Sequence, residues 1–163
     1  MSRPHNVLHI ITRLDPGGSS ENTLITVAGL DRRRYRPSLM TGPSAEGVAA
    51  ILIPHLSRKI HLLNDLLAFG EIYHKIRHGG YTIVHTHSSK AGILGRWAAW
   101  LAGVPIIVHT PHGHVFYGYY GRILSYLFIL LERLTARITD KIITLTEQGI
   151  REHVERHIAP REK

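Results

Sequence analysis

Histidines gather at two places in this 163-residue sequence. His85 and His87 stand in the run HTHSSK, and His109, His112 and His114 stand in the run HTPHGH. Imidazole can bind zinc, exchange a proton near neutral pH or hydrogen-bond a sugar hydroxyl. The sequence has no cysteine, no HExxH helix and no carboxylate near these histidines, and such groups usually complete a zinc site. We therefore expect no bound metal, and favour hydrogen bonding to a sugar or to a backbone carbonyl.

A glycine pair in the run DPGGSS is the second feature that could do chemistry. Gly17 and Gly18 follow a short apolar run and precede a helical pattern. Glycine lets the backbone approach a ligand closely, and the free N–H groups of a helix N-terminus suit a phosphate. A plain tight turn remains the alternative, because neither a complete G-x-G-x-x-G nor a Walker lysine motif occurs.

Short apolar runs alternate with helical patterns along the chain and must position these residues. Strands are predicted at 6–12, 36–42, 51–54, 82–87, 105–110 and 141–146. Helices are predicted from a cap at Ser19 or Ser20 to 30, over 64–78, from a cap at Ser88 or Ser89 to just before Gly103, over 122–138, and from 147.

This alternation predicts an α/β fold, a Rossmann-like doubly wound parallel sheet covered by helices on both faces. Ligands of such sheets bind beyond the carboxyl ends of the strands, where the glycine pair and both histidine runs fall. One link is irregular, since few residues separate Met40 from Ile51 and a parallel crossover needs about a dozen. Either its helix is reduced to a turn or the chain lacks a segment there.

The charge balance favours an anionic partner. Lys and Arg number 20 against 12 Asp and Glu, a formal net charge of +8, which suits nucleotide phosphates or phospholipid head groups. The tight basic run 32–34 is expected to be a solvated turn, and without a nucleic-acid module we expect no nucleic-acid partner. The most apolar stretch, 123–131, is about half of a membrane span. We expect a cytoplasmic protein, soluble or peripheral at the inner face of the membrane.

Five segments of the chain carry a resemblance to a known family. They are RLDPGGSSENTL, VAGLDRRRY, IVHTHSSKAGILGRWAAWLAGVP, IVHTPHGHVFYGYYG and LERLTARITDKIITLTE. Together they resemble the N-terminal domain of family 4 glycosyltransferases, which are retaining, nucleotide-sugar-dependent enzymes of GT-B architecture. The likeness is closest to bacterial members that build capsular, exopolysaccharide or lipopolysaccharide chains. It implies that residues 1–163 form one acceptor-side domain of a hexosyltransferase, lacking the C-terminal nucleotide-sugar domain and inactive alone.

The resemblance also implies a role for individual residues. His112 matches the family histidine that touches the transferred sugar near the reacting carbon. The donor side is expected to include Gly17, Gly18 and Gly113, and the acceptor side Glu21, His87, Ser88, Ser89, Lys90 and His114. The nucleotide-sugar acts as co-substrate, the acceptor is a glycan or a lipid-linked glycan, and the family needs no metal and no other cofactor.

Two alternatives stay open from the sequence. A sugar-nucleotide 2-epimerase shares the two-domain architecture but would be expected to carry acid–base carboxylates in this half, and no convincing pair is present. A non-catalytic module that binds anionic membranes would use the +8 charge without chemistry.

Overall fold

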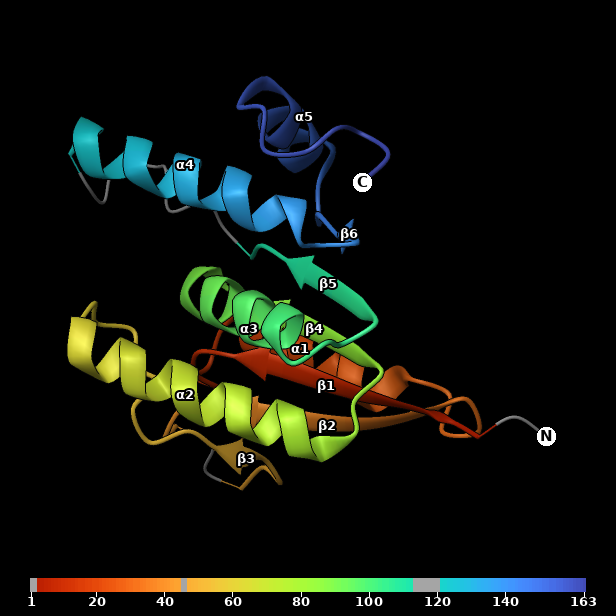
Figure 1. Cartoon of the computed structure of the whole chain (residues 1–163). Helices are drawn as coiled ribbons and strands as arrows, with labels where there is room; N and C mark the ends of the chain where they lie inside the picture. Colours follow the sequence, from red (N-terminus) through yellow and green to blue (C-terminus); the bar gives the residue numbers. More distant parts are fainter. Residues whose placement is uncertain (1–2, 45–46, 113–120) are drawn as a thin grey trace.

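The structure, a computed structural model, describes residues 3–44, 47–112 and 121–163 (Figure 1). Its strands are β1 (His5–Ile11), β2 (Tyr35–Thr41), β3 (Ile51–Leu52), β4 (Ile83–His87), β5 (Ile106–Thr110) and β6 (Lys141–Ile142). Its helices are α1 (Gly18–Gly29), α2 (Leu62–Gly79), α3 (Ser89–Leu101), α4 (Arg122–Arg137) and α5 (Glu147–Glu155). Within these described residues, no helix is both long and apolar enough to cross a membrane.

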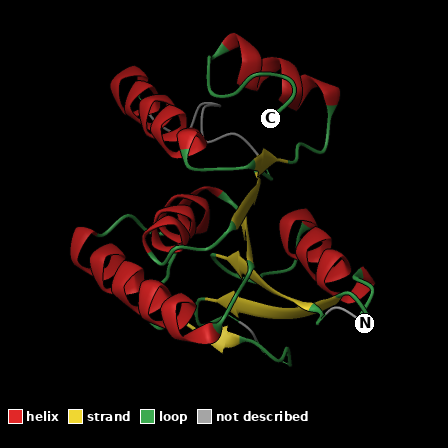
Figure 2. Cartoon of the chain, turned by 45° about the vertical axis from the view of Figure 1, so that its right-hand side comes forward, coloured by secondary structure: helices red, strands yellow, loops and turns green. Residues whose placement is uncertain are grey.

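All six strands form one parallel sheet, in the order β3-β2-β1-β4-β5-β6. The strand order reverses between β1 and β4, which pair with His9 opposite His85. Helices α2 and α3 lie on one face of the sheet and α1 lies on the other (Figures 1 and 2). The predicted doubly wound fold is therefore confirmed, and its topological switch point lies between β1 and β4.

The apolar core fills the face of the sheet that α2 and α3 cover. Alternate residues of β1 and β4 point to this face, and they pack on small side chains of α3. At Gly95 an added Cβ would lie 2.8 Å from the Thr86 side chain and 3.1 Å from that of Ile10. Small residues thus let α3 sit close to the strands. The buried core residues include Leu8, Ile10, Ile72, Ile76, Val84, Ala98, Ala99 and Ile107.

A buried ion pair ties α4 to α3. The Arg96 side chain is completely buried, and it donates to both carboxylate oxygens of Glu132, at 3.0 and 2.8 Å, and to the carbonyl of Gly92. Nearby, the Trp97 indole N–H donates to the Thr135 hydroxyl at 3.0 Å. These contacts hold α4 beside α3.

Three local predictions need correction. The strands expected at 51–54 and 141–146 shrink to two residues each, because β3 and β6 are edge strands that pair at only two positions. Neither Ser19 nor Ser20 caps α1, which begins at Gly18 with Gly17 as its N-cap. Ser88 does stand at the N-cap of α3, but its side chain makes no capping bond.

The link between β2 and β3 is as short in the structure as the sequence indicates. Its described residues contain no helix, so the crossover is reduced to turns. Gly42 stands where the chain leaves β2, and an added Cβ would lie 2.0 Å from the Leu56 carbonyl oxygen and 2.7 Å from that of Thr12. Only glycine allows this close approach, which brings the end of β2 against the end of β1.

Candidate active site at the carboxyl edge of the sheet

The ends of β1, β4 and β5 bring the predicted site residues together. His87 is the last residue of β4, and His112 comes two residues after β5 ends at Thr110. Thr12 directly follows β1, and Gly17 and Gly18 start α1 a few residues later. Parallel strands place all their carboxyl ends at one edge, so these loops share one side of the molecule.

A chain of histidine rings runs from this edge into the protein. His112 Nε2 lies 3.0 Å from His87 Nδ1, and their stacked rings are 5.3 Å apart between centroids. His87 Nε2 in turn lies 3.1 Å from His9 Nδ1, with centroids 5.4 Å apart. His112 is half-buried, whereas His87 and His9 are buried. The half-buried ring is thus held by the fully buried ones.

These rings are uncharged at neutral pH. Burial lowers the pKa of His9 to about 4. Burial, together with the neighbouring His9 and His112, lowers the pKa of His85 to about 3. The pKa of His87 is lowered further, by burial and by the surrounding imidazoles. Burial also lowers the pKa of His112. Each neutral ring therefore has one N–H donor and one acceptor nitrogen.

One nitrogen at each end of the chain of rings has no partner among the described residues. These are His112 Nδ1 and His9 Nε2, and both atoms are buried. A buried polar atom without a partner is costly and calls for a physical reason.

A pair of hydroxyl groups joins β1 to α3 beside this chain. The Thr12 hydroxyl lies 2.9 Å from the Ser88 hydroxyl and accepts a hydrogen bond from the Ala91 N–H at 3.2 Å. Thr12 therefore does the capping that the sequence assigned to Ser88 or Ser89. Ser88 has φ 63° and ψ 164°, a backbone conformation in which non-glycine residues are rare.

The glycine pair is exposed at the N-terminus of α1. Gly17 has φ 155°, which side-chain-bearing residues rarely adopt, and an added Cβ at Gly17 or Gly18 would meet nothing within 4 Å. Glycine is thus needed here for the backbone conformation and not for close packing. An exposed helix N-terminus without side chains in front of it remains open to an anionic group.

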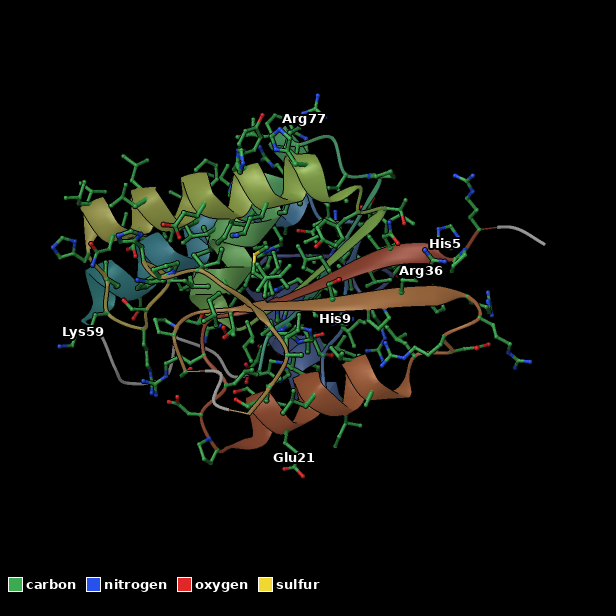
Figure 3. The ribbon with its side chains drawn as sticks, turned by 90° about the horizontal axis from the view of Figure 1, so that it is seen from below. His5, His9, Glu21, Arg36, Lys59 and Arg77 are labelled. Atoms are coloured by element: carbon green, nitrogen blue, oxygen red, sulfur yellow. The ribbon has the colours of Figure 1, made fainter. Side chains whose placement is uncertain are left out.

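The other predicted acceptor residues lie in different surroundings. Lys90 Nζ lies 2.5 Å from Asp65 Oδ1 and also donates to the Lys59 carbonyl, so it fastens the start of α3 to the start of α2. Ser89 is half-buried at the first position of α3. Glu21 lies on the outer side of α1 and points away from His9 (Figure 3). Gly113 and His114 lie outside the described residues.

Two residues of this edge, His9 and Thr12, are not among the residues predicted from the sequence, and His109 of the run HTPHGH lies apart from His112. His9 stands alone in the apolar run NVLHIIT, where a polar residue in a buried strand could have drawn attention. His109 follows β5's alternation to the opposite face, where it meets Thr86 and Gly92. Alternation along β4 puts His85 and His87 on one face of the sheet, and the β4–β5 register puts His109 on the other.

Two shallow hollows lie away from these residues, at the β5–β6 end of the sheet. One, of about 430 Å³, is lined in part by Trp100, Arg137 and Asp140. The other, of about 300 Å³, is lined in part by Thr144 and His153. Neither of these two hollows includes a described residue of the predicted site.

Comparison with known families matches residues 5–163 to the glycosyl transferase 4-like domain. The chain belongs to this family. It is also 42% identical over 100 residues to a UDP-Gal:alpha-D-GlcNAc-diphosphoundecaprenol alpha-1,3-galactosyltransferase of Escherichia coli. That alignment covers 61% of this chain and 26% of the relative, so it spans about a quarter of the relative's length.

Solved structures of low sequence identity share the fold. A UDP-N-acetylglucosamine 2-epimerase from Rickettsia bellii superposes with a TM-score of 0.72 at 14% identity, covering 98% of this chain and 43% of the epimerase. Anabaena HepE in complex with UDP superposes with a TM-score of 0.64 at 14% identity, covering 93% and 41%. The chain thus corresponds to less than half of each, in proteins of the same architecture.

Proposed function

We propose that this domain serves a retaining hexosyltransferase that moves a sugar from a UDP-sugar to a lipid-linked glycan in cell-surface polysaccharide synthesis. The family match supports glycosyl transfer over epimerisation, and the relative's printed activity supports the donor and the acceptor class. The observation that carries the residue assignment is the position of His112. Its Nδ1 stands at the carboxyl edge with no hydrogen-bond partner among the described residues, and its Nε2 is held by His87.

His112 acts in this proposal by positioning the transferred sugar. A neutral imidazole fixed by His87 presents its second nitrogen to a sugar hydroxyl or carbonyl oxygen without the cost of ordering a free side chain. The exposed glycine pair faces the diphosphate, whose negative charge grows as the glycosidic bond breaks, and the free N–H groups of α1 favour that charge. In this proposal transfer also requires a second domain that binds the nucleotide.

Transfer by the longer protein tests the role of His112. UDP-galactose and a diphosphate-linked N-acetylglucosamine lipid serve as substrates, and product anomeric configuration is read by NMR. His112→Ala is expected to lower kcat about 100-fold. The control His78→Gln, on the exposed side of α2, should keep full activity. Unchanged turnover in His112→Ala would remove the role, and an inverted product would remove the retaining assignment.

An exposed apolar surface favours a peripheral membrane contact for the same protein. The start of α2 presents a leucine patch, with Leu62 87% and Leu66 65% exposed. Lys59, which directly precedes Ile60 in the chain, is exposed and points outward (Figure 3). Lys90 links this end of α2 to α3, next to the proposed acceptor side. The leucine patch consists of Ile60, Leu62, Leu63, Leu66 and Leu67.

Apolar side chains beside basic ones suit an anionic bilayer carrying a lipid-linked acceptor. Sedimentation with phosphatidylglycerol vesicles should show salt-sensitive binding, weakened in Leu62→Gln/Leu66→Gln. The matched control is Leu101→Gln, which changes a leucine 53% exposed at the other end of α3. Equal binding by both variants, or none by the unmodified protein, would contradict the contact.

A further inference from the structure

Three buried histidines lie side by side on the face of the sheet opposite α2 and α3. His9 pairs with His85 across β1 and β4, and His87 lies two residues further along β4, so all three side chains share one face. One nitrogen of each ring lies within 4.8 Å of one from each other ring. We infer that His9, His85 and His87 form a binding site for a divalent transition-metal ion of the zinc type.

The spacing of the ring nitrogens supports an ion. Tetrahedral zinc with bonds of about 2.0–2.1 Å keeps its ligand nitrogens roughly 3.3 Å apart. His9 Nδ1 and His87 Nε2 already stand at 3.1 Å. All the nitrogens of the group lie within 4.8 Å of one another, so no pair has to close by more than roughly 1.5 Å.

Hydrogen bonding alone does not complete this group. His9 Nδ1 and His87 Nε2 face each other at 3.1 Å and would both turn to the ion. His9 Nε2, which is buried and has no partner among the described residues, is the nitrogen that the ion would not use. An apolar side chain would fill this strand position without that cost. The presence of three adjacent imidazoles in place of apolar side chains indicates a use for their nitrogens that the hydrogen bonds do not show.

Two of the rings have the outer partners that metal-binding histidines usually have. A ligating histidine commonly uses its second nitrogen to bond a neighbouring group, which fixes the ring orientation. His85 Nε2 lies 2.8 Å from the Thr110 hydroxyl, and His87 Nδ1 lies 3.0 Å from His112 Nε2. These bonds leave His85 Nδ1 and His87 Nε2 for an ion. Burial also keeps the rings in the uncharged form that binds metals.

The ligand set selects the kind of ion. Three imidazoles suit zinc, cobalt, nickel or copper, whereas magnesium and calcium require oxygen ligands. Three protein ligands also leave a fourth position for an exchangeable ligand. His9 lies outside the runs HTHSSK and HTPHGH, where no metal was expected, and it is the residue that completes the group of three. The metal site shares His87 with the contact that holds His112. Variants at His9 and His85 leave that contact in place, so the metal site and sugar transfer can fail separately.

Metal titration of the chelator-treated chain tests the inference. Co²⁺ should produce the visible bands of a tetrahedral or five-coordinate complex at one ion per chain, and Zn²⁺ should displace it and raise the Tm. His9→Gln and His85→Gln are each expected to weaken Zn²⁺ binding by about tenfold or more. Absence of one-to-one binding by the unmodified chain would overturn the site.

Exposed histidines provide the necessary control. His74 and His78 lie one turn apart on the exposed side of α2 with ring centroids 4.4 Å apart, an arrangement that can hold an adventitious ion. His74→Gln/His78→Gln should keep the one-to-one site. Loss of binding in this variant and retention in His9→Gln would refute the proposal. If the buried variants fail to fold, X-ray absorption of zinc-loaded unmodified chain decides: three imidazole ligands support the site, and fewer overturn it.

Discussion

The two faces of the sheet bury their histidines in different ways. On the α3 face, His109 is packed against Gly92, and its Nδ1 lies 2.9 Å from the Thr86 hydroxyl and 3.2 Å from the Thr86 carbonyl. Burial and the neighbouring Arg96 guanidinium hold its pKa well below the usual value. On the opposite face, His9 and His87 bond to other rings, and their chain ends at the half-buried His112.

The difference separates a structural histidine from candidate ligands. His109 is fixed by a hydroxyl, a carbonyl and a helix, and none of these can exchange for a substrate. The rings on the other face are partnered mainly by one another, and two of their nitrogens are left over. In a protein with 13 histidines, the partners of a ring are more informative about function than the number of rings nearby.

The largest expected effect lies on the α3 face, where pairing is most complete. Arg96→Met should lower the free energy of unfolding by about 3–5 kcal/mol, because Glu132 loses both of its bonds to the buried guanidinium. Urea denaturation measures the loss. The double variant Arg96→Met/Glu132→Gln should recover part of it. A loss below about 1 kcal/mol would mean that the α3 face does not depend on this pair.

The packing of His109 gives the next effect. Gly92→Ala puts a Cβ 2.5 Å from the His109 ring carbon Cε1, so the ring or α3 has to shift. The expected cost is about 1–3 kcal/mol. Gly70→Ala, in α2 with nothing within 4 Å of the added Cβ, should instead stabilise by roughly 0.5–1 kcal/mol. Equal stability of the two variants would show that His109 is not tightly packed.

On the face opposite α3, the buried His9 should make the free energy of unfolding depend on pH. In the unfolded chain histidines bind protons below a pH of about 6.5, whereas His9 in the folded chain does so only near its pKa of about 4. The stability due to the neutral ring is present above a pH of about 6.5, and it is lost as pH falls from about 6.5 towards the folded pKa of about 4. His9→Leu, measured with a chelator present, should reduce the slope by up to about 1.4 kcal/mol per pH unit. Unchanged slopes would mean that His9 is protonated in the fold.

Much of the fold could be predicted because apolar alternation depends on local residues. This alternation predicts the strands at the centre of the sheet. The glycine pair at 79–80 predicts the end of α2. The predicted lengths of the edge strands β3 and β6 are too long. Their apolar residues are typical of longer strands, but each strand pairs with one neighbour at only two positions. Periodicity describes which face a residue takes and not how far a strand stays paired.

The location of the candidate site could be predicted from the sequence, but the contacts between its residues could not. The rule that loops follow parallel strands at one edge located His87, Ser88 and His112 correctly at that edge. The contact between His9 and His87 depends on the β1–β4 register, and these residues are 78 positions apart. The capping of α3 by Thr12 depends on the same register. Such tertiary pairings leave no local pattern for the sequence to show.

Ser88 has a consequence for how this domain can evolve. Its φ of 63° and ψ of 164° lie in a region that glycine occupies almost alone, so a serine there stores backbone strain of about 1–3 kcal/mol. A glycine would release that strain, and it would also remove the hydroxyl that bonds Thr12. A Ser88→Gly change would therefore have two opposing effects on stability, one from the backbone and one from the lost hydrogen bond to Thr12.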